Sequence, residues 1–228
     1  NDTLASGNTG AVADKVYGQA GNDTLSNGTG TAATTLDGGT GNDTLTGSDV
    51  ADLILTGGTG DDTFDVTAVI TTEVTNITDF ESAGAEVGDV IKLNSATTTD
   101  GTAAGLAPVI GTITTEQEGE AAAVFASGSA STADLVIVTG TNGTGDLSAN
   151  TNANGTELLK DMLEGPDLGI PAAANDEFYI LAYDDTSAYL YYAHDSGGGT
   201  IVAAEIFLIA KIDTITANSM VAEDFILG

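Results

Sequence analysis

The sequence contains no cysteine, no arginine, only four lysines and only one histidine, and these absences exclude several classes of protein. Without cysteine there is no disulfide scaffold and no thiolate zinc site. The single histidine, His194, excludes every catalytic or metal site that needs two. The 34 acidic side chains leave a formal charge of −30. Nucleic acid and anionic membranes are bound by clustered Lys and Arg, so neither is an expected partner.

Catalytic motifs and membrane-spanning runs are also missing. The chain has neither the H-E-x-x-H of zinc proteases nor the G-x-S-x-G of lipases. No stretch approaches the roughly 18 consecutive apolar residues of a membrane span. Hydrophobic residues still make up 41% of the 228 residues, which favours a folded chain with a core. We expect a protein that is not an enzyme.

Acidic residues are distributed unevenly along the chain. The segment 1–65 contains ten Asp, no Glu and one Lys. Solubility alone does not favour Asp so strongly over Glu. The short Asp carboxylate can reach its own backbone or an ion in a tight turn, where Glu is too long. The bias therefore indicates turns in which Asp has a structural or ion-binding role.

A repeat occupies the same region. The tetrapeptide N-D-T-L occurs at 1–4, 22–25 and 42–45, and D-D-T-F follows at 61–64, so the copies recur at nearly equal intervals. The fuller pattern G-G-x-G-x-D-x-U-x, in which U is a large apolar residue, is intact from Gly38 and from Gly57. The copy that starts at Gly18 has lost one glycine. This register argues against a disordered linker and predicts stacked structural units.

These motifs resemble the calcium-binding repeats of the repeats-in-toxin (RTX) family, which bacteria export by type I secretion. The resemblance implies a right-handed parallel β-roll in which Ca²⁺ lies between stacked turns. Glycines allow such turns, and backbone carbonyls and Asp supply the oxygen ligands that a hard cation prefers. The candidate metal-site residues are Asp2, Gly18, Gly21, Asp23, Gly38, Gly39, Gly41, Asp43, Gly57, Gly58, Gly60 and Asp62.

The spacing further predicts a lopsided roll. If alternate nonapeptides lie on opposite edges, the turns with Asp2, Asp23, Asp43 and Asp62 stack on one edge. The intervening turns are poor copies, with Val in place of a motif glycine at 9–14 and 47–52 and no motif at 27–37. We therefore expect two or three calcium ions along one edge and few or none along the other.

Beyond residue 65 apolar alternation replaces the repeat. The segments 75–80 and 88–93 are similar to those that follow the roll in serralysin-type carboxy-terminal domains, where they cover its open end. For Asp79 and Asp89 we favour a solvated or turn-capping role over ion binding. Further along, the pattern predicts a strand at 134–139, a helix at 156–163, a hairpin from 178–183 and 188–193, and one or two strands within 201–212.

The end of the chain is similar to that of RTX carboxy-terminal domains, in which an uncleaved terminal segment is read by the exporter. Here Phe225-Ile226-Leu227 can be that signal, a last strand of the sheet, or both. We thus expect an all-β chain in two parts. Residues 1–65 form the calcium-binding β-roll, and residues 66–228 form a capping, sandwich-like β region with one short helix that ends in the secretion signal.

Two further groups of residues are candidates for sites. His194 is followed by Asp195 and Ser196, but a solvated loop histidine is favoured over a catalytic one because sequence neighbours point to different faces. Five of the six tyrosines gather between Tyr179 and Tyr192. In strands they should alternate between core and surface, and ordinary packing is favoured over an outward row that binds sugar or a neighbouring subunit.

Two functions remain open. The first is a secreted calcium-binding structural protein, the carboxy-terminal part of a bacterial surface-layer, sheath or adhesin protein. It would fold and assemble on calcium outside the cell, with other copies, cell-surface components or polysaccharide as partners. The second is the export and folding module of a larger secreted hydrolase or toxin. In both, the type I exporter is a partner and the chain is extracellular.

Overall fold

The chain is built from β-strands in the part that the computed structural model describes. That part comprises residues 1–7, 13–28, 33–48, 53–67, 74–82, 88–94, 110–114, 135–139, 167–172, 177–183, 186–194, 199–202, 205–215 and 219–228. No α-helix occurs in these ranges, and η5 (Ala222–Asp224) is a short 3-10 turn. Nothing helical in them is long and apolar enough to cross a membrane. The all-β prediction is confirmed, while the predicted helix at 156–163 lies outside the described residues.

The first sheet is wholly parallel. Within the described residues its strands run in the order β1 (Thr3–Ala5), β3 (Thr24–Ser26), β5 (Thr44–Thr46), β7 (Thr63–Asp65), β9 (Val90–Leu93) and β17 (Phe225–Leu227). Pairing aligns the equivalent residue of each repeat, so that Thr3, Thr24, Thr44 and Thr63 face one another across the sheet. The last strand, β17, pairs in parallel with β9, which confirms the predicted terminal strand.

The second sheet is mixed. In the described residues its order is β10 (Ile110–Thr114), β11 (Leu135–Thr139), β13 (Glu177–Tyr183), β14 (Ser187–His194), β16 (Ile206–Asp213), β8 (Thr75–Ile77), β6 (Leu53–Thr59), β4 (Thr34–Thr40) and β2 (Asp14–Tyr17). Pairing from β2 to β16 is parallel, and β13, β14 and β16 pair antiparallel. A separate antiparallel pair is formed by β12 (Asp167–Ala172) and β15 (Gly199–Val202).

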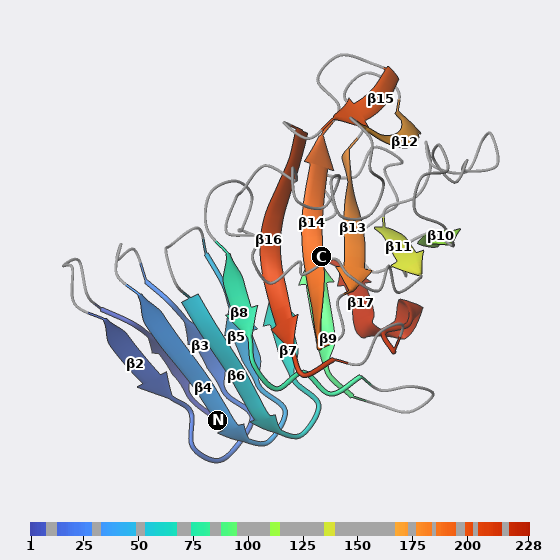
Figure 1. Ribbon diagram of the computed structural model, residues 1–228. Helices are drawn as coiled ribbons and strands as arrows, with labels where there is room; N and C mark the ends of the chain where they lie inside the picture. The colour runs from blue at the N-terminus through green and yellow to red at the C-terminus, as the bar shows by residue number, and fades with distance from the viewer. Residues whose placement is uncertain are drawn as a thin grey trace.

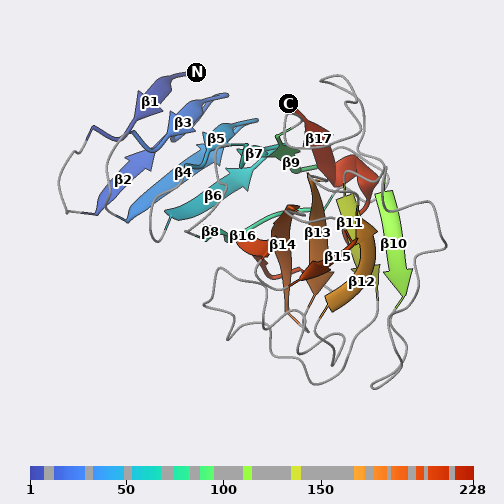
Figure 2. The ribbon, with the colours of Figure 1, turned by 90° about the horizontal axis from the view of Figure 1, so that it is seen from above.

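The two sheets lie face to face as two layers. Seen from above, the odd-numbered strands from β1 to β9 form one row and the even-numbered strands from β2 to β8 the other (Figure 2). Up to β9 the chain therefore alternates between layers at every strand. The same rows continue into the carboxy-terminal strands, since β16 follows β8 and β17 follows β9 (Figures 1 and 2).

The segments 75–80 and 88–93 were expected to cover the open end of the roll, but their strands lengthen the two sheets instead. Their strands β8 and β9 do not pair with each other but extend one sheet each. The carboxy-terminal strands β16 and β17 then pair onto them. Both sheets are thus continuous across the boundary predicted at residue 65, because the strands on either side of it have compatible edges.

One continuous apolar cluster lies between the layers and runs from the repeats into the carboxy-terminal strands. In the repeats, each three-residue strand of the first sheet contributes one inward side chain, and Leu25, Leu45 and Phe64 are fully buried. These are the apolar residues two positions after each motif Asp. Full burial of such a side chain stabilises by about 1.5–3 kcal/mol, so each repeat adds only a modest amount.

The predicted hairpin is confirmed by the antiparallel pairing of β13 with β14. The expectation that its tyrosines alternate between core and surface is wrong. The residues concerned are all buried, namely Tyr179, Tyr183, Tyr189, Tyr191 and Tyr192. Neighbours along a strand point to opposite faces, so Tyr191 and Tyr192 show that both faces of the sheet are covered here. These five side chains therefore pack internally and form no outward row.

Candidate functional site

The well-preserved repeat turns stack on one edge of the two layers. Each connects an even-numbered strand to the next odd-numbered strand, as β4 to β5 and β6 to β7. Because their strands pair in register, Asp23, Asp43 and Asp62 occupy equivalent places in successive turns. The one-edge stacking predicted from the spacing is confirmed. The poor repeat copies of the other edge lie largely outside the described residues.

Glycine is needed in these turns for conformational reasons. Gly39 and Gly58 have φ of 103° and 104°, in the left-handed region that side chains rarely adopt. Gly41 and Gly60 also have positive φ. The degenerate first copy places Gln19 at the position of Gly39, and Gln19 takes the same kind of conformation with φ of 72°. The turn thus keeps its shape without its glycine, at the cost of backbone strain.

The motif aspartates form a continuous hydrogen-bonded column, here called the Asp column, along this edge. Each carboxylate Oδ1 accepts a hydrogen bond from the backbone N–H of the Asp one turn earlier. The donor–acceptor pairs are Asp2 to Asp23, Asp23 to Asp43 at 2.7 Å, Asp43 to Asp62 at 2.8 Å and Asp62 to Asp89 at 2.9 Å. The column ties four successive turns to the segment before β9.

A second column runs beside it through the preceding residue of each motif, with the opposite direction of donation. The side-chain oxygen of Asn1 accepts from the N–H of Asn22 at 2.7 Å, and that of Asn22 accepts from Asn42 at 3.1 Å. Asn42 accepts from the N–H of Asp61 at 3.3 Å. This column is exposed, whereas the Asp column is buried. The asparagines therefore join turns at the surface without adding charge.

The second carboxylate oxygen of the column is the unusual feature of the site. Asp23, Asp43 and Asp62 are only 1–2% exposed. In the described residues, Oδ2 of Asp23 and Oδ2 of Asp43 are buried and accept no hydrogen bond. A buried charged oxygen without a partner is costly, by several kcal/mol in an apolar environment. Oδ1 of Asp23 lies 3.4 Å from the amino group of Asn1, whereas Asp43 has no such neighbour among the described residues, so its Oδ2 calls for a cationic partner or a proton.

The first glycine of each motif lets a backbone carbonyl approach the same oxygen. A β-carbon on Gly18 would lie 2.8 Å from Oδ2 of Asp23 and 2.5 Å from the carbonyl oxygen of Gly38. A β-carbon on Gly38 would overlap Oδ2 of Asp43 and lie 2.6 Å from the carbonyl oxygen of Gly57. Glycine thus leaves room where a carboxylate oxygen and the carbonyl of the next turn converge. Oxygens of this kind are the ligands that Ca²⁺ takes.

Burial also changes the acidity of the column. The pKa of Asp62 is raised to about 6, chiefly by desolvation and also by the nearby carboxylates of Asp89 and Asp43, while the hydrogen bond from the Asp43 N–H opposes the rise. Desolvation likewise raises the pKa of Asp89 to about 6. The pKa of Asp43 is raised by the same cause. The ionised carboxylates of Asp43, Asp62 and Asp89 therefore destabilise the column at neutral pH unless a cation lies among them.

Asp79 and Asp89 close the carboxy-terminal end of the edge. The two carboxylate oxygens of Asp79 accept from the N–H groups of Gly57 and Gly58 at 2.9 and 2.8 Å. Those of Asp89 accept from Asp62 and Glu81 at 2.9 and 2.8 Å. The predicted turn-capping role is confirmed for both, and Asp89 is buried at 3% exposure rather than solvated.

The other candidates stand apart from this edge. His194 ends strand β14, where its Nε2 lies 4.0 Å from Glu177. The predicted loop position of His194 is therefore wrong, because the residue belongs to a strand. Asp195 and Ser196 lie outside the described residues, so their placement beside His194 stays untested. Across the described ranges, no group of three or more His, Asp or Glu side chains is arranged to hold a metal by side chains alone. A metal on the Asp column would need backbone carbonyls as well.

Sequence reasoning missed the link from this edge to the end of the chain. Oγ of Ser82 lies 2.8 Å from Oδ2 of Asp224, which also accepts from the N–H of Val221 at 2.7 Å. Asp224 is fully buried. An acidic residue directly before a terminal apolar strand was the available signal, but it does not identify Ser82.

No protein-family model, curated protein or solved structure matches this chain.

Proposed function

We propose that the amino-terminal repeats form a right-handed calcium-binding β-roll of the RTX type, and that calcium binding drives the folding of a secreted, non-enzymatic structural protein. The observation that carries the proposal is the pair of buried, unpartnered Oδ2 atoms of Asp23 and Asp43. They recur at the motif spacing, beside glycines that make room for carbonyl oxygens. A divalent cation between turns would satisfy both atoms.

The residues present fit calcium better than other metals. Calcium takes six to eight oxygen ligands from carboxylates, carbonyls and water, and it tolerates irregular geometry. Asp23, Asp43 and Asp62 would supply charge, and the carbonyls of Gly38 and Gly57 would supply neutral oxygens. Without cysteine and with one histidine the chain offers little to softer metals. We expect two or three ions along this edge.

Calcium would act by stabilising the folded state of the repeats. Ordering a residue costs about 1–2 kcal/mol of conformational entropy, and each repeat buries little apolar surface to offset it. A ligand that binds only the folded state stabilises that state in proportion to the logarithm of its concentration. The repeats would stay unfolded and exportable at low cytosolic calcium and would order in millimolar calcium outside the cell.

The same folding would remove the end of the chain from the exporter. Phe225 and Leu227 are buried in β17, and Asp224 is held by Ser82. If these residues carry the secretion signal, it is accessible only before β17 pairs with β9. Export would therefore precede folding, as calcium-coupled folding requires.

The role favoured after folding is assembly at the bacterial cell surface, as part of a surface-layer, sheath or adhesin protein. The support is the absence of catalytic motifs and the chain's lack of cysteine and arginine. Electron microscopy and light scattering in calcium should reveal ordered assemblies that dissolve in chelator, whereas a folded monomer would favour the export-module alternative.

The calcium proposal is tested by one substitution with a matched control. Asp43→Asn keeps an oxygen that can accept from the Asp23 N–H but replaces the buried unpartnered Oδ2 by an amide nitrogen. Asp61→Asn makes the same charge change one residue before the motif Asp62, where the other repeats have Asn. In calorimetric titrations, Asp43→Asn should weaken calcium binding at least about tenfold, since one charged ligand is lost, and Asp61→Asn should not. Unchanged binding by Asp43→Asn, or no calcium response of the native chain, would overturn the proposal.

A further inference from the structure

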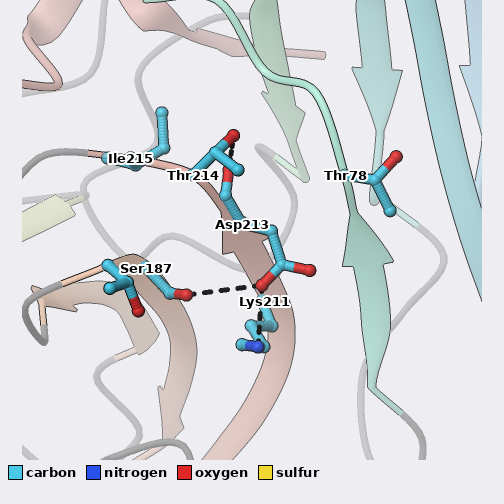
Figure 3. Close-up of a pocket in the computed structure, with 7 residues that line it drawn as sticks. Thr78, Ser187, Lys211, Asp213, Thr214 and Ile215 are labelled. Carbon is cyan, nitrogen blue, oxygen red and sulfur yellow. Dashed lines mark hydrogen bonds and ion pairs between the residues drawn. The ribbon is translucent and has the colours of Figure 1, made fainter.

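A polar pocket lies on the second sheet, several strands away from β2 and β4 of the repeats. A pocket of about 610 Å³ forms where β8 meets β14 and β16, within the volume range of small-molecule sites. Figure 3 shows the side chains that line it, among them Thr78, Ser187, Lys211, Asp213, Thr214 and Ile215. Because Ala210 and Ile212 belong to the core cluster, Lys211 and Asp213 point to the outer face of the sheet.

An ion pair supplies the chemistry of this pocket. Nζ of Lys211 lies 2.7 Å from Oδ1 of Asp213, and Oγ of Ser187 donates to the same oxygen at 3.3 Å. Oδ2 of Asp213 makes no hydrogen bond within the described ranges, and in Figure 3 it points into the space toward Thr78. The lysine ammonium has three N–H donors, of which this pair uses one. An acceptor and unused donors thus lie side by side.

Backbone strain marks the same place. Thr214, directly after the ion pair, has φ of 64°, which is rare for a β-branched residue. Its Oγ1 donates to the carbonyl of Asp213 at 2.6 Å. Strained residues tend to cluster at ligand sites, where the surrounding structure holds them. Here the strain lies at the turn that ends β16 and borders the pocket.

Charge restricts the class of ligand. The chain carries a net charge of −30, so its field repels anions, while the local ion pair is neutral. A cation would be repelled by Lys211, and the carboxylates of the Asp column offer it a more favourable site. A neutral hydroxyl group both donates and accepts hydrogen bonds, so two adjacent hydroxyls match Oδ2 of Asp213 and Nζ of Lys211. Ile215 and the threonine methyl groups offer apolar contact for C–H groups.

We propose that this pocket binds a neutral carbohydrate, with a vicinal pair of hydroxyls bridging Asp213 and Lys211. The proposal goes beyond calcium-coupled folding and uses none of the residues of the Asp column. It gives the molecule a site for a glycan on the outer face of the second sheet. Asp213 accepts from one sugar hydroxyl, and Lys211 donates to its neighbour.

The test measures binding of a panel of neutral mono- and disaccharides to the full chain in calcium, by NMR chemical shifts and calorimetry, with glucuronic acid as the anionic comparison. At least one neutral sugar should bind saturably, and glucuronic acid should bind more weakly than its neutral counterpart, glucose. Asp213→Asn and Lys211→Gln should each weaken binding about tenfold or more, as loss of a charged hydrogen bond does. Lys15→Gln, at an exposed residue of β2, should leave it unchanged.

Circular dichroism and the calcium titration establish that each variant folds, and Lys211→Gln provides an independent test should Asp213→Asn be unstable. Absence of saturable binding to every neutral sugar would overturn the proposal. So would equal binding by the native chain and a folded Asp213→Asn or Lys211→Gln variant. If the sugar test fails but the native chain still responds to calcium, only the carbohydrate proposal is overturned. If the native chain binds sugar but does not respond to calcium, only the proposed function is overturned.

Discussion

The repeats and the carboxy-terminal hairpin region share both sheets but are stabilised differently. Strands β3, β5 and β7 have three residues each, whereas β13, β14 and β16 have seven or eight. The short strands bury one large apolar side chain each, while residues on both faces of β14 are buried. Because apolar burial offsets ordering entropy, the long strands have more apolar contacts of their own to stabilise them. On the proposed function, the repeats would depend in addition on a cation bound to the Asp column.

The largest expected effect is the response of the two regions to calcium removal. In chelator, amide hydrogens of β3, β5 and β7 should exchange rapidly because their carboxylates repel one another without a cation. Those of β13, β14 and β16 should stay protected by their apolar contacts. Hydrogen exchange followed by mass spectrometry measures both regions in one sample. Equal protection of the repeats with and without calcium would contradict the difference between the regions.

A smaller effect is expected from adding a single methyl group to the edge. The β-carbon of Gly38→Ala would overlap Oδ2 of Asp43, and Gly38 has no positive φ, so only crowding is tested. We expect a loss of about 1–3 kcal/mol in calcium, as for overpacking at a filled site.

Gly7→Ala is the matched control, because nothing lies within 4 Å of its added β-carbon. Its free energy of unfolding should change by less than about 0.5 kcal/mol, as is usual at surface positions. Thermal unfolding in calcium measures both variants. Equal stabilities of the two variants would mean that the folded state does not need the space that Gly38 leaves beside Oδ2 of Asp43.

The effect of pH should also separate the regions. The pKa values of Asp62 and Asp89 are about 6 in the folded chain against an ordinary 3.8, so the folded state binds more protons between these values. The calcium-free stability of the repeats should therefore fall as pH rises from about 4 through about 6, and stay low above. On the proposed calcium binding, the cation would replace these protons, so its stabilising effect should be greater at about pH 7 than at about pH 5.

Thermal unfolding at both pH values, with and without calcium, measures this difference. Asp62→Asn should flatten the calcium-free pH dependence, because one of the carboxylates with a raised pKa is removed. A calcium-free chain that becomes more stable as pH rises through this window would have the opposite linkage and would contradict the burial of ionisable carboxylates in the column.

The smallest expected effect comes from repairing the degenerate repeat. Gln19→Gly removes a side chain from a residue with φ of 72° and restores the pattern of the later copies. We expect a gain of about 1 kcal/mol, the size of the strain for a non-glycine residue in this region. Thermal unfolding in calcium measures it, with Gln19→Ala as the comparison, which should show no gain. A destabilised Gln19→Gly would mean that the Gln side chain has a contact role.

Much of the repeat edge could be predicted from spacing alone. The nearly equal intervals between motif copies place equivalent residues on every second strand, which is why Asp23, Asp43 and Asp62 align as expected. The hairpin was predictable because its two apolar runs flank a short polar turn. The burial of Tyr189 and Tyr191 was not, since alternation gives the face of a residue but not what covers that face.

The sequence by itself determined the turn shape, the stacking of the well-preserved turns on one edge and the carboxylates that line it, because glycine conformation and Asp reach are local properties. Only the tertiary structure decided that Asp89 completes the Asp column, that β16 and β17 extend the sheets, and that Lys211 and Asp213 lie beside Thr78. These contacts join segments that lie far apart along the chain. Such pairings depend on which edges and apolar faces meet, and no local pattern encodes that choice.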